Sequence, residues 1–176
     1  KVGLLVITPG LTTNGNSAAD FTFQVQDYGG AAIGCVDLDP SANTLPGTVN
    51  TVSDASAASD KTVTTNEDSG FTFAAADFGF TDAVEGNSLL AVKITTLPGA
   101  GTLTLNGVAV TAGQFVSVAD INAGLLVFTP ALNANGNGYA NFTFQVQDNG
   151  GTANGGVDLD PSANTITVNV NPVNDN

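Results

Sequence analysis

Apolar and polar residues alternate with a period of two along several short segments of the chain. In the segment 142–147, Phe142, Phe144 and Val146 alternate with threonine and glutamine, and in the segment 166–171 isoleucine and valine alternate with threonine and asparagine. Successive side chains of a strand point to opposite faces, so this pattern is typical of strands with one buried face. No window carries a sustained apolar stripe of helical period.

These patterns predict an all-β fold of short strands joined by turns. The predicted strands are 61–65, 70–75, 89–96, 101–105, 108–110 with 114–116, 125–129, 140–148 and 164–173. Asn106 and Gly107 separate two alternating segments and predict a two-residue hairpin turn, and we expect one helical turn within 117–124. About seven short strands are typical of a Greek-key β-sandwich of the immunoglobulin type. Tyr139 stands where such sandwiches often bury a tyrosine.

The chain contains an internal repeat with an offset of 121 residues. The sequence FTFQVQDYGG at 21–30 returns as FTFQVQDNGG at 142–151, and VDLDPSANT at 36–44 returns at 157–165. Residues 1–55 align with 122–176 without a gap, and 35 of these 55 positions are identical. We therefore interpret the chain as part of a tandem repeat with a 121-residue period.

The repeat divides the chain into three parts. Residues 1–52 match only the C-terminal half of a repeat, residues 53–60 (SDASAASD) are a small and polar linker, and residues 61–176 form a complete repeat. A half repeat by itself leaves strand edges and an apolar face without cover. The missing half either precedes residue 1 in a longer protein, which is the simpler interpretation, or comes from another chain.

The charge balance excludes several classes of function. Sixteen acidic residues face three lysines, there is no arginine or histidine, and the net charge is −13. Binding of nucleic acid or of an anionic membrane surface needs cationic side chains, so neither is expected. The absence of histidine excludes His-dependent catalytic triads and histidine zinc sites. No apolar run approaches the ~18 residues of a membrane span, and the single cysteine, Cys35, excludes an intramolecular disulfide.

The acidic residues fall in loops that a sandwich brings to its two ends. One end is expected to hold Asp54, Asp82, Glu85, Asp148, Asp158 and Asp160, and the opposite end Glu67, Asp68 and Asp175 with its neighbours Asn174 and Asn176. So few lysines are present that converging carboxylates need another counter-ion. A divalent metal is the obvious candidate, and calcium (Ca²⁺) takes six to eight oxygen ligands of this kind; the alternative for any one acid is that it serves only solubility. For Asp148 alone, the alternative is a simple Asx-type turn over 148–150.

The order of several motifs resembles the cadherin-like tandem repeats of very large bacterial surface adhesins, including RTX-type adhesins. These motifs are NED, FTDAVEGNSL, KITTLPGAGTLTLNG, LLVFTP, FTFQVQDNGG and NPVNDN. The resemblance covers essentially all of 61–176, and 1–52 as a half repeat. It implies a cadherin-like, immunoglobulin-like sandwich on the bacterial cell surface, outside the cell, with calcium bound between successive domains.

The resemblance also implies a set of calcium ligands. Carried over residue by residue, they are Glu67, Asp82, Glu85, Asp148, Asn174, Asp175 and Asn176, with Asp27 matching Asp148 in the half repeat and Asp54 in the incoming linker. The acidic pair Asp82 and Glu85 is spaced by two residues where the family has one. The incoming linker reads Ser53-Asp54-Ala55 where the outgoing one reads Asn174-Asp175-Asn176. This loss of oxygen donors predicts weaker calcium binding, and a more flexible joint, at residues 53–60.

Two further acidic pairs lie outside the cadherin pattern. They are Asp37 with Asp39 and Asp158 with Asp160, in the two copies of VDLDP. Because both copies carry the pair, it forms either an additional calcium site or a solvated hairpin.

The leading functional interpretation is a non-enzymatic spacer of an extracellular adhesin or surface fibre, stiffened by calcium at its joints. Its partners would be neighbouring repeats of the same protein. The alternative is a filament subunit in which another copy of the chain completes residues 1–52. A third class, a module that binds carbohydrate or a host surface, has little support because the chain has two tyrosines and no tryptophan. Loop carboxylates without a cleft do not favour an enzyme.

Overall fold

The fold is taken from a computed structural model of the chain, which describes residues 20–26 and 39–174. The chain divides into two compact units, Lys1–Thr51 and Val52–Asn176. Each unit is described by itself. Asp27, Cys35, Asp37, Asp175 and Asn176 lie outside the described residues.

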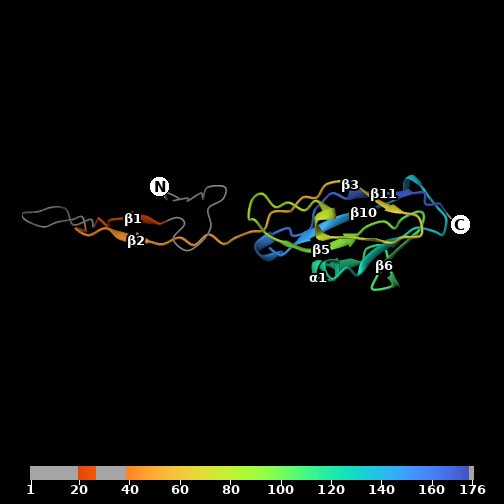
Figure 1. Cartoon of the computed structure of the whole chain (residues 1–176). Helices are drawn as coiled ribbons and strands as arrows, with labels where there is room; N and C mark the ends of the chain where they lie inside the picture. Colours follow the sequence, from red (N-terminus) through yellow and green to blue (C-terminus); the bar gives the residue numbers. More distant parts are fainter. Residues whose placement is uncertain (1–19, 27–38, 175–176) are drawn as a thin grey trace, which may run out of the picture. The chain divides into compact units, whose positions relative to one another are not determined.

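Unit 2 is a sandwich of two β-sheets, ordered β3-β11-β10-β5-β8 and β4-β9-β6-β7 (Figure 1). The strands of the five-stranded sheet are β3 (Lys61–Asn66), β5 (Leu89–Ile94), β8 (Phe115–Ser117), β10 (Gly136–Asp148) and β11 (Asn164–Asn171). Those of the four-stranded sheet are β4 (Phe71–Thr72), β6 (Thr102–Leu105), β7 (Val108–Ala109) and β9 (Leu126–Thr129). The predicted all-β, immunoglobulin-like sandwich is confirmed.

The first and last strands of unit 2 are neighbours and run parallel (Figure 1). Lys61 lies opposite Ile166 at their beginnings, and Asn66 lies opposite Asn171 at their ends. Both strands therefore start at one end of the sandwich, here called the proximal end, and finish at the opposite, distal end. The chain enters unit 2 at the proximal end and leaves it at the distal end.

The core lies between the two sheets and is built from the alternate residues that the sequence pattern indicated. Phe142, Phe144 and Val146 on β10 are fully buried. The ring of Phe73 meets that of Phe142 edge-on at a centroid distance of 5.6 Å, and Phe78 meets Phe144 edge-on at 5.0 Å. Burying each of these side chains contributes roughly 1.5–3 kcal/mol, so this cluster is a main source of stability.

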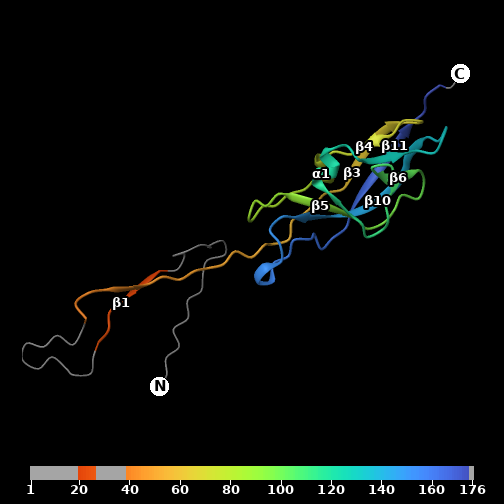
Figure 2. The ribbon, with the colours of Figure 1, turned by 90° about the horizontal axis from the view of Figure 1, so that it is seen from below.

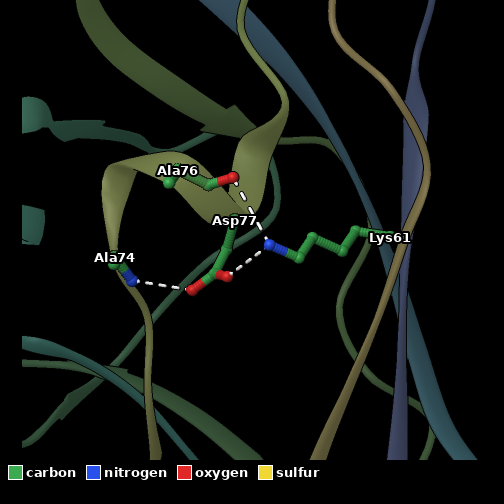
Figure 3. Close-up of polar contacts among 4 residues, drawn as sticks. All are labelled: Lys61, Ala74, Ala76 and Asp77. Atoms are coloured by element: carbon green, nitrogen blue, oxygen red, sulfur yellow. Dashed lines mark hydrogen bonds and ion pairs between the residues drawn. The ribbon is translucent and has the colours of Figure 1, made fainter.

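One predicted strand, 70–75, is mostly wrong. Only β4 (Phe71–Thr72) forms a paired strand, and after the extended Ala74 the chain forms the 3-10 helix η1 (Ala75–Phe78). The carboxylate of Asp77 accepts a hydrogen bond from the backbone N–H of Ala74 at 2.9 Å and pairs with Lys61 Nζ at 2.9 Å (Figure 3). An aspartate that bonds local backbone favours a turn over a strand. Lys61 also donates to the carbonyl of Ala76 and thereby ties β3 to η1.

The segment predicted as 108–110 with 114–116 changes sheet partway. Its first part, β7, pairs with β6, and its second part, β8, pairs with β5 in the other sheet. The hairpin turn before β7 is confirmed, since Asn106 and Gly107 have φ values of 49° and 78°, as a two-residue turn of this kind requires.

The helical turn predicted in 117–124 is confirmed as α1 (Val118–Asn122), which lies close to β5 (Figure 2). It also lies close to β8. Ser117 caps it by accepting a hydrogen bond from the N–H of Asp120 at 3.0 Å. A second 3-10 helix, η2 (Ala153–Gly155), precedes β11. Tyr139 is half-buried, and its hydroxyl accepts a hydrogen bond from the N–H of Ala131 at 3.1 Å.

The described part of unit 1 is an antiparallel hairpin of β1 (Phe21–Phe23) and β2 (Asn43–Leu45). Its register places Phe21 opposite Leu45 and Thr22 opposite Thr44. With the offset of 121 residues, this is the register of β10 and β11, where residue 142 lies opposite 166 and 143 opposite 165. The strand β2 ends before Pro46, which cannot donate a hydrogen bond to a ladder.

Candidate functional site

The acidic residues that the sequence predicted at the two ends of the sandwich, as far as they are described, lie where strands begin or end there, whereas Asp77 lies in η1 and Asp120 in α1. At the proximal end, Asp148 terminates β10 and its side chain is fully buried. Its Oδ1 accepts hydrogen bonds from the N–H of Gly150 at 2.8 Å and from Ser53 Oγ at 3.3 Å, and its Oδ2 accepts one from Ser56 Oγ at 2.7 Å. The Asx-type turn at 148–150 is therefore present, and the same carboxylate holds the incoming chain.

Asp160 holds the incoming chain in the same way from the loop before β11. Its side chain is 2 % exposed. Oδ1 accepts hydrogen bonds from the N–H and hydroxyl of Ser162 at 2.9 and 2.8 Å. Oδ2 accepts one from the N–H of Ala58 at 3.1 Å and one from Asn164 Nδ2 at 3.3 Å. The neighbouring acid, Asp158, is half-buried and accepts a hydrogen bond from Gln147 Nε2 at 3.1 Å.

Residues 53–60, which we expected to be a linker, are part of the sandwich unit. Ala57 and Thr81 exchange two backbone hydrogen bonds of 2.9 and 2.8 Å, and Val157 donates to the carbonyl of Ser53 at 2.8 Å. Ser53 and Ser56 are only 7 % and 3 % exposed. The correction has a physical reason: the acceptors that order this segment lie about a hundred residues further along the chain, where composition gives no sign of them.

Asp82 organises the proximal loop that follows η1. Its carboxylate accepts four backbone hydrogen bonds, from Asn87 at 2.8 Å, Val84 at 3.0 Å, Glu85 at 3.1 Å and Gly86 at 3.3 Å. Burial raises the pKa of Asp82, but these N–H groups, led by that of Asn87, outweigh burial and hold the pKa below 3.8. Glu85 accepts a hydrogen bond from the N–H of Asp54 at 3.2 Å. The two acids of the predicted pair thus bind different parts of the chain.

At the distal end, Glu67 is a buried acid that accepts hydrogen bonds, as Asp148 and Asp160 are at the proximal end, and it is 5 % exposed. Its Oε2 accepts a hydrogen bond from Asn135 Nδ2 at 2.8 Å, and its Oε1 accepts one from the N–H of Val173. The bond from Asn135, followed by that from Val173, holds the pKa of Glu67 below 4.5. Its own N–H donates to the carbonyl of Asn171 at 2.9 Å. Glu67 therefore holds the outgoing chain, and the exposed Asn174 follows directly.

These contacts bear on the calcium interpretation. Within residues 20–26 and 39–174, no three acidic or cysteine side chains lie close enough together to hold a metal ion. Glu67, Asp148 and Asp160 use both carboxylate oxygens to accept hydrogen bonds from the protein. Asp160 accepts two hydrogen bonds on each oxygen and has no lone pair left for a cation, whereas each oxygen of Glu67 accepts one and keeps a second lone pair. The described residues do not by themselves form a closed calcium site. The predicted ligands Asp27, Asp37, Asp175 and Asn176 lie outside the described residues.

Hydrogen bonds satisfy the polar groups of this region without cations. Every buried side-chain nitrogen or oxygen in the described part of the chain has a hydrogen-bond partner. The described ion pair, between Lys61 and Asp77, lies at η1 and does not involve the carboxylates that hold the incoming and outgoing chain. At both ends, buried carboxylates accept hydrogen bonds from the chain where it enters and where it leaves the sandwich.

A sequence model of the bacterial Ig domain family matches residues 53–171. The chain belongs to the bacterial Ig domain family. The match begins at Ser53, which Asp148 holds, and ends at Asn171, the last residue of β11.

Bacterial Ig domains are generally non-enzymatic structural modules, typically exposed at the cell surface. No curated protein and no solved structure matches the chain. None of the helices in the described residues is long and apolar enough to cross a membrane.

Sequence reasoning missed Ser53 and Ser56 as partners of Asp148. The internal repeat gave no signal for them, because residue 53 aligns with an asparagine, Asn174, and residue 56 has no counterpart within the chain. Asn135, the partner of Glu67, was also missed, although Asn14 occupies the aligned position in the first copy.

Proposed function

We propose that this bacterial Ig domain is a non-enzymatic, extracellular structural module that carries tension between the segments joined to its two ends. The parallel pairing of β3 and β11 is the observation that supports this function. The chain enters at the proximal end of one strand and leaves at the distal end of its neighbour. A load applied through the chain then shears six paired positions together rather than opening them one at a time.

The buried carboxylates at the two ends support the same proposed function, because they attach the chain to the sandwich outside the paired strands. Asp148 and Asp160 bind residues 53–58 to the sandwich before β3 begins, and Glu67 binds Val173 after β11 ends. Charge-assisted hydrogen bonds are roughly twice as strong as neutral ones. They are therefore suited to keep the incoming and outgoing segments attached to the sandwich while the strands are loaded.

Stretching single molecules of the full chain by its two ends tests this function. We expect unit 2 to unfold in one main step, which releases about 120 residues and lengthens the chain by roughly 400 Å at ~3.3–3.6 Å per residue. In the variant Ser56→Ala, residues 53–58 should detach in a separate, earlier and shorter step. The matched control is Ser59→Ala, an exposed serine of the same segment. Unfolding of the unchanged chain in several small steps would contradict the proposal.

We also propose, as a finer and separable point, that calcium binds at the distal joint through Glu67, Asn174 and Asp175. The net charge of −13 supports it, because most carboxylates of the chain have no cation available to them. Calorimetric titration of the full chain with calcium should show uptake that Glu67→Gln removes and Asp54→Asn leaves in place. Absence of uptake by the unchanged chain would overturn the calcium proposal and leave the tension-bearing module standing.

A further inference from the structure

One strand at a sheet edge of unit 2 is much longer than the other edge strands. The edge strands β4, β7 and β8 have two, two and three residues. Strand β3 (Lys61–Asn66) has six and pairs with β11 on one side. Among the described residues, no strand pairs along its other side. In the described part of the chain, β3 is therefore the longest edge at which backbone N–H and C=O groups are open to another strand.

Strand β3 lacks most of the features by which proteins protect a sheet edge. Such edges are usually very short, bulged, or interrupted by proline or charged residues. The register of β3 with β11 runs from Lys61 to Asn66 without a shift, whereas the pairings of β10 with β11 and with β5 each contain one. Residues 62–65 are Thr-Val-Thr-Thr, all β-branched, and such residues favour strands. The edge is therefore regular and suited to strand pairing.

The charged groups next to this edge are used within their own domain. Lys61, the charged residue of β3, pairs with Asp77 at 2.9 Å and turns toward η1 (Figure 3). The flanking acids Asp60 and Glu67 accept hydrogen bonds from elsewhere in unit 2 at 2.7 and 2.8 Å. Between these groups, residues 62–66 carry no charge. Two chains with a net charge of −13 can therefore meet along this edge without bringing carboxylates of the strand together.

We propose that β3 pairs antiparallel with β3 of a second copy of the chain, so that their two five-stranded sheets become one continuous sheet. A two-fold axis perpendicular to the sheet relates the copies and keeps the buried faces of both on the same side. Val63 is 5 % exposed, whereas Thr62 and Thr64 on the opposite face are exposed. An axis through Val63 therefore places Thr62 of one copy opposite Thr64 of the other.

A second copy is the occupant that the strand itself favours. An antiparallel edge is complementary to itself, because each open N–H meets a C=O of the same strand running in the other direction. Threonines that face each other across a strand pair also stabilise it through contact and hydroxyl hydrogen bonds. The contact involves about one strand from each copy, so association should be weak and depend on concentration. This inference does not rest on the tension-bearing function.

Sedimentation of the full chain over a range of concentrations tests the proposal. We expect the average mass to rise from 17.5 kDa towards twice that value by about 1 mM. Thr64→Lys should raise the dissociation constant about tenfold or more, because like charges then meet across the axis. Thr152→Lys is the matched control, since it adds the same charge at an exposed position before η2. A chain that stays monomeric at about 1 mM, or equal losses in the two variants, would overturn the proposal.

Amide exchange of the same samples shows where the copies meet. Exchange within residues 62–66 should slow about tenfold at concentrations where dimers predominate, and Thr64→Lys should reverse this while leaving the core amide of Phe144 protected. If Thr64→Lys unfolds the domain and Phe144 loses protection, Thr62→Lys on the same exposed face replaces it. Association that either lysine variant leaves intact, and that Phe23→Asp in unit 1 abolishes, would assign the contact to the β1–β2 hairpin and refute the proposal.

Discussion

Replacing Asp148 by alanine would show whether this carboxylate stabilises the Ig domain through hydrogen bonds or as a calcium ligand. The change removes the acceptor of three hydrogen bonds, from Ser56, Gly150 and Ser53, at 2.7, 2.8 and 3.3 Å. Both serines are buried, so their hydroxyls have little access to water as a substitute. The incoming chain would lose its attachment to β10.

The size of the effect follows from these contacts. Hydrogen bonds to a charged group contribute about 1.5–3 kcal/mol each, and the two short ones dominate. Alanine also relieves the cost of burying the charge, which keeps the total near 3–5 kcal/mol. For a unit of this size that loss lowers the melting temperature by roughly 10–20 °C. Asp148→Asn keeps one acceptor oxygen for Gly150 and should cost about half as much.

Thermal melting followed by far-ultraviolet circular dichroism measures these changes, with each variant melted in calcium and again in chelator. We expect the loss in Asp148→Ala to be the same in both solutions. Asp158→Asn is the control, because that residue accepts a described 3.1 Å hydrogen bond and is half-buried, so it should cost less than about 1 kcal/mol. A loss seen in calcium and absent in chelator would mean that Asp148 acts as a metal ligand, and would refute the reasoning.

Two further predictions concern acid and glycine. Hydrogen bonds lower the pKa values of Glu67 and Asp82 in the folded state, so the unfolded chain binds their protons first as acid is added. Stability should stay level above about pH 5 and fall as the pH drops from there through the lowered pKa values, and melting of Glu67→Gln should show a shallower fall. A stability that rises as acid is added would contradict this. At Gly150, an added Cβ would lie 2.1 Å from Ser53 Oγ, so Gly150→Ala should displace Ser53 and lower the free energy of unfolding, measured by chemical denaturation, by about 1–3 kcal/mol. The control is Gly99→Ala, whose added Cβ meets nothing within 4 Å and should cost little. Equal losses in the two variants would count against the packing argument.

Much of the sandwich could be predicted from local pattern. The period-two alternation on β10 and β11 reports directly which side chains are buried, and the Asn106-Gly107 turn follows from the backbone that those residues favour. Where the prediction was wrong, a single side chain decides the structure. The predicted strand 70–75 ends early, and the 3-10 helix η1 begins at its last residue, Ala75, where Asp77 bonds the N–H of Ala74 and Nζ of Lys61.

Only part of the candidate site could be predicted from the sequence. Loop order was enough to place Asp148, Asp160 and Glu67 at the two ends of the sandwich. Their hydrogen-bond donors could not be predicted, because Ser56 and Asp148 are 92 residues apart and Asn135 and Glu67 are 68 apart. Carboxylates in loops have the same sequence signature whether they bind calcium or backbone N–H groups. The calcium, filament and carbohydrate-binding interpretations therefore stay predictions.

The central claim is that residues 53–58 belong to the folded module and do not form a flexible joint. Amide hydrogen exchange at Ala57 and Ala58 tests it most directly, since their N–H groups donate to the carbonyl of Thr81 at 2.9 Å and to Asp160 Oδ2 at 3.1 Å. We predict that both exchange only when unit 2 unfolds as a whole, with the same free energy as the amide of Phe144. Exchange at the rate of an unstructured chain would contradict the claim.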